Sequence, residues 1–393
     1  MLTYNSGYNV MPACLDEVVN RQGTNSVKWS KAAGEGLFPM HLADMEFLTD
    51  FKIVSAISER SKHAVYGYTH YPETLFDSAG NWFGRRHNWG LKKEWISVCH
   101  GVISSLNTAV RAFSKAGGKI IIQPPVYNQF YSAIENNGRI VRENRLVYKN
   151  NRYEINFEEF AELAKDAEIF MLCNPHNPVG RVWTKEELTL LGDICLKNNV
   201  RVISDDIHCD FTYGAGYTPL ASLKSSYENI CLTCLSPSKT FNLAGLNASI
   251  AVIPCKLMRE KFDAEMTKNG LGRVNIFGMA ALEAAYSGGD AWLDNVLEYL
   301  KGSLTLATEI LSGLKNGRLV VPEGTYLLWV DLGKANLDES VMVDILRHKV
   351  GIISEPGSSF GAQGNGFIRL NMACSRGLLE KYLTRLVDAF NRV

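Results

Sequence analysis

Short apolar runs alternate with segments of helical periodicity through the middle of the chain. The runs rich in β-branched residues predict strands at residues 119–123, 169–173, 200–204 and 230–235. Residues 184–199 predict a helix, because Thr184 and Glu187 can form a capping box ahead of an apolar stripe. Such alternation is typical of βαβ units. We therefore expect an α/β fold with a mainly parallel sheet and helices on both faces.

The pattern changes near residue 290. A long helix, an apolar strand and two further helices are predicted in turn at residues 292–314, 326–332, 339–348 and 376–390. A chain of 393 residues exceeds the size at which one hydrophobic core usually keeps growing, so we expect two domains. We predict a large domain over residues 46–290, and a smaller α+β domain formed by residues 1–45 and 291–393.

Polar residues follow each strand predicted in the middle of the chain. In chain order they include Tyr127, Asn177, Asp205 and Lys239. Ligands bind beyond the carboxyl ends of strands in open α/β sheets, so we expect these residues to meet in one crevice. Each also has a plainer interpretation. Lys239 can be a solvated side chain, Asp205 a helix N-cap and Asn177 a turn residue.

Together these residues meet the requirements of one cofactor, pyridoxal 5′-phosphate (PLP). PLP needs an amine that forms a Schiff base and then moves the substrate's Cα proton, and Lys239 can supply it. It needs a carboxylate at its pyridine nitrogen, for which Asp205 is suited. Asn177 and His208 can donate hydrogen bonds to the phenolic oxygen, and Tyr127 can cover the ring.

The phosphate of PLP also needs an anion site. An amphipathic helix begins with Gly101, Val102 and Ile103, and the free N–H groups of its first turn can bind an anion. Ser236 and Ser238 can add hydroxyl donors. An amino-acid carboxylate would find a bidentate partner in Arg369, although an arginine on a strand can also be a plain surface charge.

Eight segments resemble, in the same order, those of the fold-type-I PLP-dependent enzymes, the class I/II aminotransferase superfamily. They are ADMEF (43–47), YGYT (66–69), QPPVY (123–127), CNPHNPVGRVW (173–183), SDDIHCD (204–210), SPSKTFNLAGL (236–246), PEGTYLLWVD (322–331) and FIRLNMAC (367–374). The first and sixth resemble most the cystathionine β-lyase, or C–S lyase, branch of PatB- or MalY-like proteins. The resemblance implies a mainly parallel seven-stranded sheet in the large domain.

The resemblance also implies roles for residues outside the predicted crevice. It places Ala43 and Asp44 beside the substrate carboxylate, and Tyr68 at the phosphate in the neighbouring subunit. A homodimer with shared active sites is therefore implied. Several positions depart from the usual patterns, among them Asn247 and Asp206. Asn247 stands where aminotransferases often have an arginine, which fits the lyase branch, and Asp206 stands where that branch usually has a glutamate.

We therefore predict a PLP-dependent C–S β-lyase with Lys239, Asp205 and Tyr127 as catalytic residues. It would cleave L-cystathionine or a related cysteine S-conjugate to a thiol, pyruvate and ammonia. An aminotransferase is the alternative, because both reactions begin by removing the same Cα proton. A binding protein without turnover would not need Lys239, Asp205 and Arg369 together. A nicotinamide site at GAQGNG (361–366) is disfavoured, because this segment does not open a helix after a strand.

Composition narrows the remaining classes of function. Lys+Arg and Asp+Glu both number 41, so we expect no general attraction to nucleic acid or membrane surfaces. There is no run of 18 apolar residues, and the N-terminus lacks a secretory pattern. Nine scattered cysteines favour a reducing cytoplasm. Cys231 and Cys234 form a CxxC motif, but on a strand they would face opposite sides, so no metal site is predicted.

Overall fold

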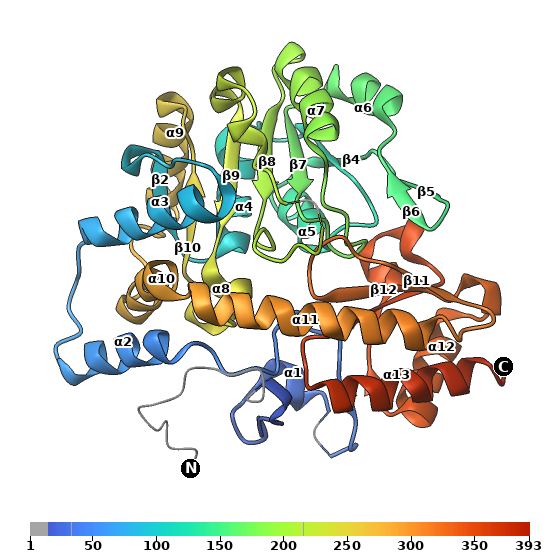
Figure 1. Ribbon diagram of the computed structural model, residues 1–393. Coiled ribbons are helices and arrows are strands. Elements are labelled where there is room, and N and C mark those ends of the chain that lie inside the picture. Colours follow the sequence, from blue (N-terminus) through green and yellow to red (C-terminus); the bar gives the residue numbers. More distant parts are fainter. Residues whose placement is uncertain (1–14, 33, 215) are drawn as a thin grey trace.

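The computed structural model describes residues 15–32, 34–214 and 216–393, and layers of helices surround a central sheet (Figure 1). The first fourteen residues of the predicted small domain, and with them the expectation of no secretory signal, lie outside the described residues. Within those ranges, no helix is long and apolar enough to cross a membrane.

Seven strands form the central sheet. Across the sheet they are β2 (Ile96–Cys99), β10 (Ser249–Val252), β9 (Cys231–Leu235), β8 (Arg201–Asp205), β7 (Ile169–Cys173), β3 (Lys119–Ile122) and β4 (Ile140–Glu143). The pairs from β9 to β4 are parallel, and only β10 runs antiparallel to its neighbours. The predicted seven-stranded, mainly parallel sheet is therefore confirmed.

Helices cover both faces of this sheet, and every strand except the edge strand β4 has buried residues on both faces. One face packs against α4 (Val102–Phe113), α5 (Gln129–Glu135) and α9 (Lys256–Lys268). The other packs against α3 (Glu73–His87), α6 (Phe157–Ala164), α7 (Lys185–Lys197) and α10 (Ile276–Gly288). Cys231 and Cys234 belong to different cores, as expected for two residues on opposite faces of β9. The predicted capping box of α7 is present between Thr184 and Glu187.

A second, antiparallel sheet follows in the C-terminal part of the chain. Its strands are, in spatial order, β11 (Arg318–Val320), β12 (Leu327–Asp331), β15 (Phe367–Asn371) and β14 (Glu355–Pro356). The long helix α11 (Asp290–Leu311) runs beneath the central sheet towards it and packs against α13 (Arg376–Phe390) (Figure 1). The predicted helix at 339–348 is α12 (Glu339–Ile345), continued by a π-helical turn over Leu346–Val350.

The N-terminal segment joins this C-terminal part. Strand β1 (Phe38–Pro39) pairs in parallel with β13 (Ile352–Ile353). The remaining α-helices and strands are α1 (Val27–Ser30), α2 (Phe51–Lys62), β5 (Val147–Lys149), β6 (Arg152–Glu154) and α8 (Pro237–Thr240). The pairing of β1 agrees with a small domain built from both ends of the chain. The boundaries at residues 45 and 290 stay a prediction.

Gly180 lies where the loop after β7 meets the segment that enters β12. Its φ of 73° is in the left-handed region, and its carbonyl accepts hydrogen bonds from the N–H groups of Glu323 (2.8 Å) and Gly324 (3.0 Å). A Cβ on Gly180 would lie 2.5 Å from Cβ of Pro322. The backbone of Gly180 therefore packs directly against Pro322, and any larger residue at position 180 would collide with it.

We expect Gly180→Ala to destabilise the protein by about 2–4 kcal/mol, because left-handed strain adds to overpacking against Pro322. The matched control is Gly138→Ala. Gly138 has a similar φ of 68°, but nothing lies within 4 Å of its Cβ position. This control should cost about 1 kcal/mol from strain alone. Urea unfolding of both variants measures the difference, and equal losses would contradict the close packing described here.

Candidate active site

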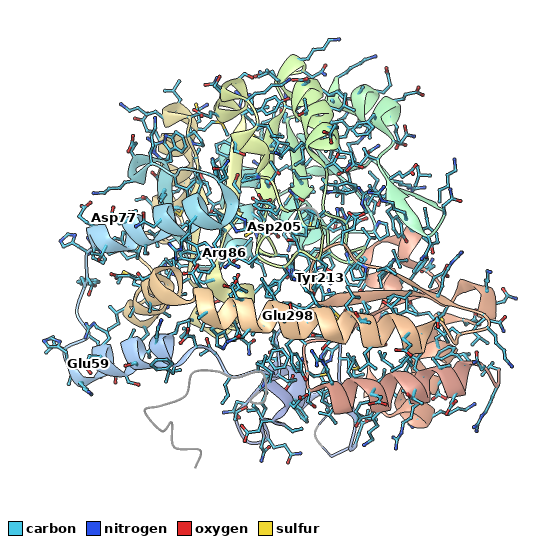
Figure 2. The ribbon with its side chains drawn as sticks, in the orientation of Figure 1. Glu59, Asp77, Arg86, Asp205, Tyr213 and Glu298 are labelled. Atoms are coloured by element: carbon cyan, nitrogen blue, oxygen red, sulfur yellow. The ribbon has the colours of Figure 1, made fainter. Side chains whose placement is uncertain are left out.

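A cavity of about 390 Å³ lies at the carboxyl ends of the central strands. Segments that follow β3, β7, β8 and β9 all contribute to its wall, which confirms that the polar strand ends converge. Asp205, which ends β8, is labelled near the middle of the molecule in Figure 2. The predicted site residues that line the cavity are Ala43, Gly101, Val102, Ile103, Tyr127, Asn177, Asp205, His208, Ser236, Ser238, Lys239 and Arg369.

Lys239 lies on the short helix α8, which begins directly after β9. Ser236 caps this helix by accepting a hydrogen bond from the N–H of Ser238 (3.1 Å). The Nζ atom of Lys239 donates to the carbonyl of Ala43 (2.6 Å). Burial, and after it the nearby charge of Arg369, lower the pKa of Lys239 to about 8. A fraction of this lysine is therefore a neutral amine, which can act as a nucleophile or base, near physiological pH.

Asp205 presents a buried carboxylate to the same cavity. It accepts a hydrogen bond from the N–H of Ile207 (3.3 Å). Burial raises the pKa of Asp205 to about 6, although the Ile207 N–H and the charge of Lys239 oppose this rise. The carboxylate is thus mainly ionised at neutral pH and suited to a cationic partner. The interpretation of Asp205 as a plain N-cap does not explain why it faces the cavity.

Asp206 lies behind Asp205, outside the cavity lining. Its carboxylate accepts hydrogen bonds from Ser204 Oγ (2.5 Å) and from the hydroxyl of Tyr217. Burial raises the pKa of Asp206 to about 7. The aspartate at this position therefore belongs to a buried hydrogen-bond network, and its difference from the usual glutamate does not change the cavity wall.

Arg369 is buried on β15, so it is not a surface charge. Its Nη1 atom donates to Oδ1 of Asn177 (3.0 Å) and its Nη2 atom to the carbonyl of His41 (2.6 Å). Its Nε atom is buried without a partner, and among the described residues no carboxylate forms an ion pair with the guanidinium. A buried cation with spare donors at a cavity wall is suited to binding a carboxylate.

Tyr127 and His208 are two cavity side chains whose pKa values are shifted so that both are uncharged near neutral pH. Burial, and then the charge of Asp205, raise the pKa of Tyr127 to about 12, so its phenol stays protonated. Burial, and then Lys239 and Arg369, lower the pKa of His208 well below its ordinary value. Its imidazole is therefore neutral, and its buried Nδ1 atom has no partner among the described residues. A bound group could supply that partner.

The predicted anion site is the start of α4. Gly101, with a φ of 87°, precedes the first residue of this helix, and Gly101, Val102 and Ile103 all line the cavity. The free N–H groups of the first turn are therefore close to a group bound there. Asn247 also lines the cavity, and its Oδ1 atom lies 3.8 Å from the Cβ position of Gly101. The hydroxyl of Ser236 donates to the carbonyl of Ala248 (2.8 Å), which leaves Ser238 as the better placed hydroxyl donor.

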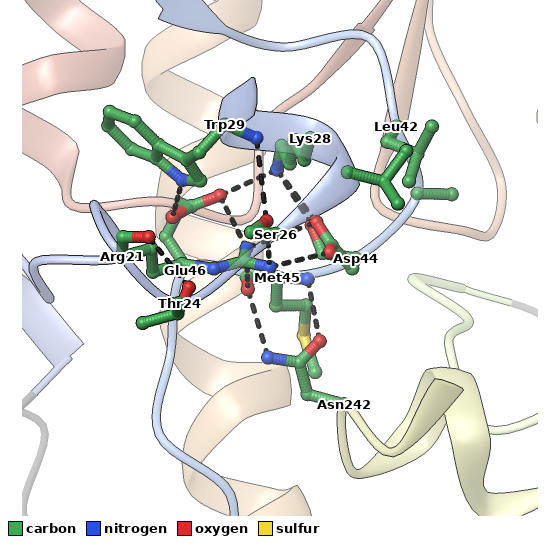
Figure 3. A network of polar contacts seen from close by, with 12 residues as sticks. Arg21, Thr24, Ser26, Lys28, Trp29, Leu42, Asp44, Met45, Glu46 and Asn242 are labelled. Atoms are coloured by element: carbon green, nitrogen blue, oxygen red, sulfur yellow. Dashed lines mark hydrogen bonds and ion pairs between the residues drawn. The ribbon is translucent and has the colours of Figure 1, made fainter. Parts of the chain in front are cut away.

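Two predicted residues do not line the cavity. The carboxylate of Asp44 pairs instead with Arg21 (2.8 Å) and Lys28 (3.2 Å), as Figure 3 shows. The carbonyl of the preceding Ala43 does reach the cavity, so this loop contributes backbone rather than a side-chain charge. Tyr68 is 99% exposed, on the segment between α2 and α3. In the single chain Tyr68 therefore does not line the cavity.

Sequence reasoning missed the residues that hold the loop containing Asp44. Asn242 binds the N–H and carbonyl of Met45 (both 2.9 Å) and the carbonyl of Phe47 (3.0 Å) (Figure 3). Lys28 is almost fully buried and also pairs with Glu46 (2.7 Å). Asn242 lies three residues after Lys239 in the segment SPSKTFN. Its place in this motif could have identified it as a residue of the site. Nothing in the local sequence distinguishes Lys28 from a surface lysine.

One cluster has potential metal ligands close together. Atoms of His87, Cys209 and Asp210 lie within 4.8 Å of one another. The carboxylate of Asp210, however, binds His87 Nε2 (2.8 Å) and accepts hydrogen bonds from Thr240 Oγ1 (2.7 Å) and Trp82 Nε1 (3.3 Å). We interpret the cluster as a network that supports α8 from behind, because Thr240 follows Lys239. The absence of a metal centre stays a prediction.

Residues 41–386 match the family model of the class I and II aminotransferases. The chain belongs to this family, as the sequence motifs predicted. It is 40% identical over 385 residues to the cystathionine β-lyase PatB of Bacillus subtilis, with 96% of this chain and 99% of the relative covered. It is 32% identical to the protein MalY of Escherichia coli, with 96% and 98% covered.

A solved structure agrees with these relatives. Cystalysin from Treponema denticola, whose crystal structure contains a pyridoxal 5′-phosphate cofactor, superposes with a TM-score of 0.92 at 31% identity. The match covers 96% of this chain and 98% of that one. The predicted fold class, that of the fold-type-I PLP-dependent enzymes, is therefore confirmed.

Proposed function

We propose that this protein is a PLP-dependent C–S β-lyase that cleaves L-cystathionine or related cysteine S-conjugates. The observation that supports it most is the meeting of Lys239, Asp205 and Arg369 in one cavity. These side chains suit an aldehyde, a ring nitrogen and a substrate carboxylate respectively. The orphaned nitrogens of His208 and Arg369 add donors that a bound cofactor and substrate would satisfy.

PLP, when bound, supplies an electron sink beside the substrate's Cα, so that the Cα–H bond can be broken. Asp205 would hold a positive charge at the ring nitrogen, because its carboxylate is buried and mainly ionised above pH 6. The start of α4 and Ser238 would bind the phosphate. Tyr127, kept protonated by its raised pKa, would cover the ring and donate from its hydroxyl.

Arg369 would orient the substrate by binding its α-carboxylate, while Asn177 holds the guanidinium in place. Lys239 would then remove the Cα proton, since its lowered pKa of about 8 makes the free amine available as a base. The resulting ammonium can protonate the departing thiolate. Cystathionine and one water molecule would thus give homocysteine, pyruvate and ammonia, with no net oxidation.

Lyase activity is favoured over amino transfer by two observations. The relative at 40% identity is named as a cystathionine β-lyase. Asn247 lines the cavity beside the start of α4, where the aminotransferase pattern often has an arginine. The phosphate would therefore depend more on backbone and hydroxyl donors than it does in those enzymes. An aminotransferase acting on an amino acid and a 2-oxo acid is the second candidate.

Purified protein should release pyruvate from L-cystathionine in step with free thiol, without any added 2-oxo acid. The reason is that β-elimination consumes only the substrate and water, whereas amino transfer needs an acceptor. Pyruvate is measured by a coupled dehydrogenase assay and thiol by a colorimetric reagent, in parallel. If keto-acid product forms only when a 2-oxo acid is supplied, the lyase proposal is wrong.

The active protein is proposed to be a homodimer with shared sites. Tyr68 is fully exposed in the single chain, and its neighbours Val65 and Tyr66 are exposed as well. Together they form an apolar strip that a second subunit could cover.

A cytoplasmic location is also proposed, supported by the eight cysteines of the described residues, which are all free thiols.

Tyr68→Phe should stay dimeric yet retain PLP about tenfold less tightly, because it loses one hydrogen bond to the phosphate in the partner's site. Sedimentation velocity reports the oligomeric state, and dialysis followed by absorbance reports PLP retention. Tyr66→Phe serves as the matched control, since the hydroxyl of Tyr66 binds the carbonyl of Ser61 within its own chain (2.9 Å). A monomeric wild-type protein, or equal PLP retention in both variants, would contradict the shared site.

A further inference from the structure

Four charged side chains line the cavity, and the proposed function uses three of them. Lys239 and Asp205 are assigned to the cofactor, and Arg369 to the substrate's α-carboxylate. The fourth is Glu355, on the short strand β14. A carboxylate in a substrate cavity favours cationic groups and repels anionic ones, so it calls for a role of its own.

Glu355 lies directly opposite Arg369 in the register of the antiparallel strands β14 and β15. Opposed residues of such a pair project from the same face of the sheet, and both side chains line the cavity. Glu355 is half-buried. Its carboxylate has no hydrogen bond or ion pair with any residue in the described part of the chain, whereas the Nη atoms of Arg369 are bound to Asn177 and His41. Glu355 is therefore available to a ligand.

The position of Glu355 relative to a bound substrate follows from the proposed function, on which this inference rests. Lys239 and Arg369 would hold the amino-acid head of the substrate. The group attached to sulfur must then occupy the rest of the cavity, whose wall includes Glu355, Phe360 and Ile103. Phe360 and Ile103 offer only apolar contacts. Glu355 is the one charged side chain left to meet that group.

We propose that Glu355 determines which cysteine S-conjugates the enzyme accepts. It binds an ammonium group on the sulfur-linked tail and disfavours tails whose only charged group is a carboxylate. The substrate class is therefore cysteine thioethers with a cationic amine in the tail, and the distal amino group of cystathionine meets this requirement. The geometry that carries the proposal is an unpaired carboxylate beside the arginine that orients the substrate.

A different role for Glu355 would leave a different pattern. If Glu355 acted only through its charge interaction with Arg369, its substitution would change kcat/KM by the same factor for every substrate. All amino-acid substrates carry the same α-carboxylate, whatever their tail. A comparison of tails that differ in charge therefore separates selection by Glu355 from a general effect on Arg369.

The test measures kcat/KM for pyruvate release by the wild-type and Glu355→Gln holoenzymes. Three substrates of similar size are used: S-(2-aminoethyl)-L-cysteine, S-propyl-L-cysteine and S-carboxymethyl-L-cysteine. The substitution should lower kcat/KM about tenfold for the ammonium tail, because a charge-assisted contact is lost. It should raise kcat/KM several-fold for the carboxylate tail, and change the value for the propyl tail by less than about twofold.

The propyl substrate also reports whether the variant folds and retains its cofactor. Glu380→Gln is the matched control, because Glu380 is exposed on α13 and does not line the cavity. It removes the same charge and should leave all three substrates unchanged. An equal change for the three substrates in Glu355→Gln, or no change for any, would overturn the inference. If the wild-type enzyme releases no pyruvate from any of them, the proposed function itself fails.

Discussion

The backbone of residues 41–47 is the constraint on which the cavity depends. This segment is largely buried but forms neither helix nor strand, so its polar groups need partners from elsewhere in the fold. Side chains from several parts of the fold supply them, among them strand β15 and helix α8. Hydrogen bonds from Arg369, Asn371, Lys239, Tyr326, Lys28 and Asn242 reach the carbonyls of this segment. Two of these donors, Lys239 and Arg369, are also the side chains that would do the chemistry.

This arrangement ties the reactive groups to both parts of the molecule. Lys239 follows a strand of the central sheet, and Arg369 belongs to the C-terminal sheet, yet both donate to carbonyls only two residues apart, those of Ala43 and His41. Any relative movement of the two sheets would disturb this shared segment. The segment thereby fixes the separation between the amine and the guanidinium, which must match the length of an amino-acid head.

Charge is balanced around the same segment. Arg21 and Lys28 face Asp44 and Glu46, and the four side chains form a compensated network. Such pairing is needed because Lys28 is almost fully buried, and an unpaired charge there would be costly. In the cavity itself the charged groups have few direct contacts. Arg369 forms no ion pair with a carboxylate among the described residues, although the charge of Glu355 acts on it, and Asp205 accepts a long hydrogen bond from the N–H of Ile207 (3.3 Å).

The strands and the polar residues at their ends could be predicted from the sequence, because periodicity and strand-end chemistry are local properties. β7, for instance, has the predicted bounds, and Asp205 and Asn177 face the cavity as expected. The pairing of Asp44 with Lys28 could not be predicted, since it depends on how a short helix docks on a distant loop. Glu355 was missed for a similar reason. Its two-residue strand has no periodicity, and only the register with Arg369 brings it to the cavity.

The central claim is that Lys239 holds the cofactor, and chemical trapping tests it most directly. Sodium borohydride reduces the bond between PLP and the amine that holds it, which fixes the cofactor to that residue. Peptide mapping of the reduced protein by mass spectrometry should then find the pyridoxyl phosphate mass on Lys239. Lys239→Ala should carry no such label, and Lys334→Ala, at an exposed lysine, should be labelled like the wild type. Label on a different lysine, or none on the wild-type protein, would contradict the account.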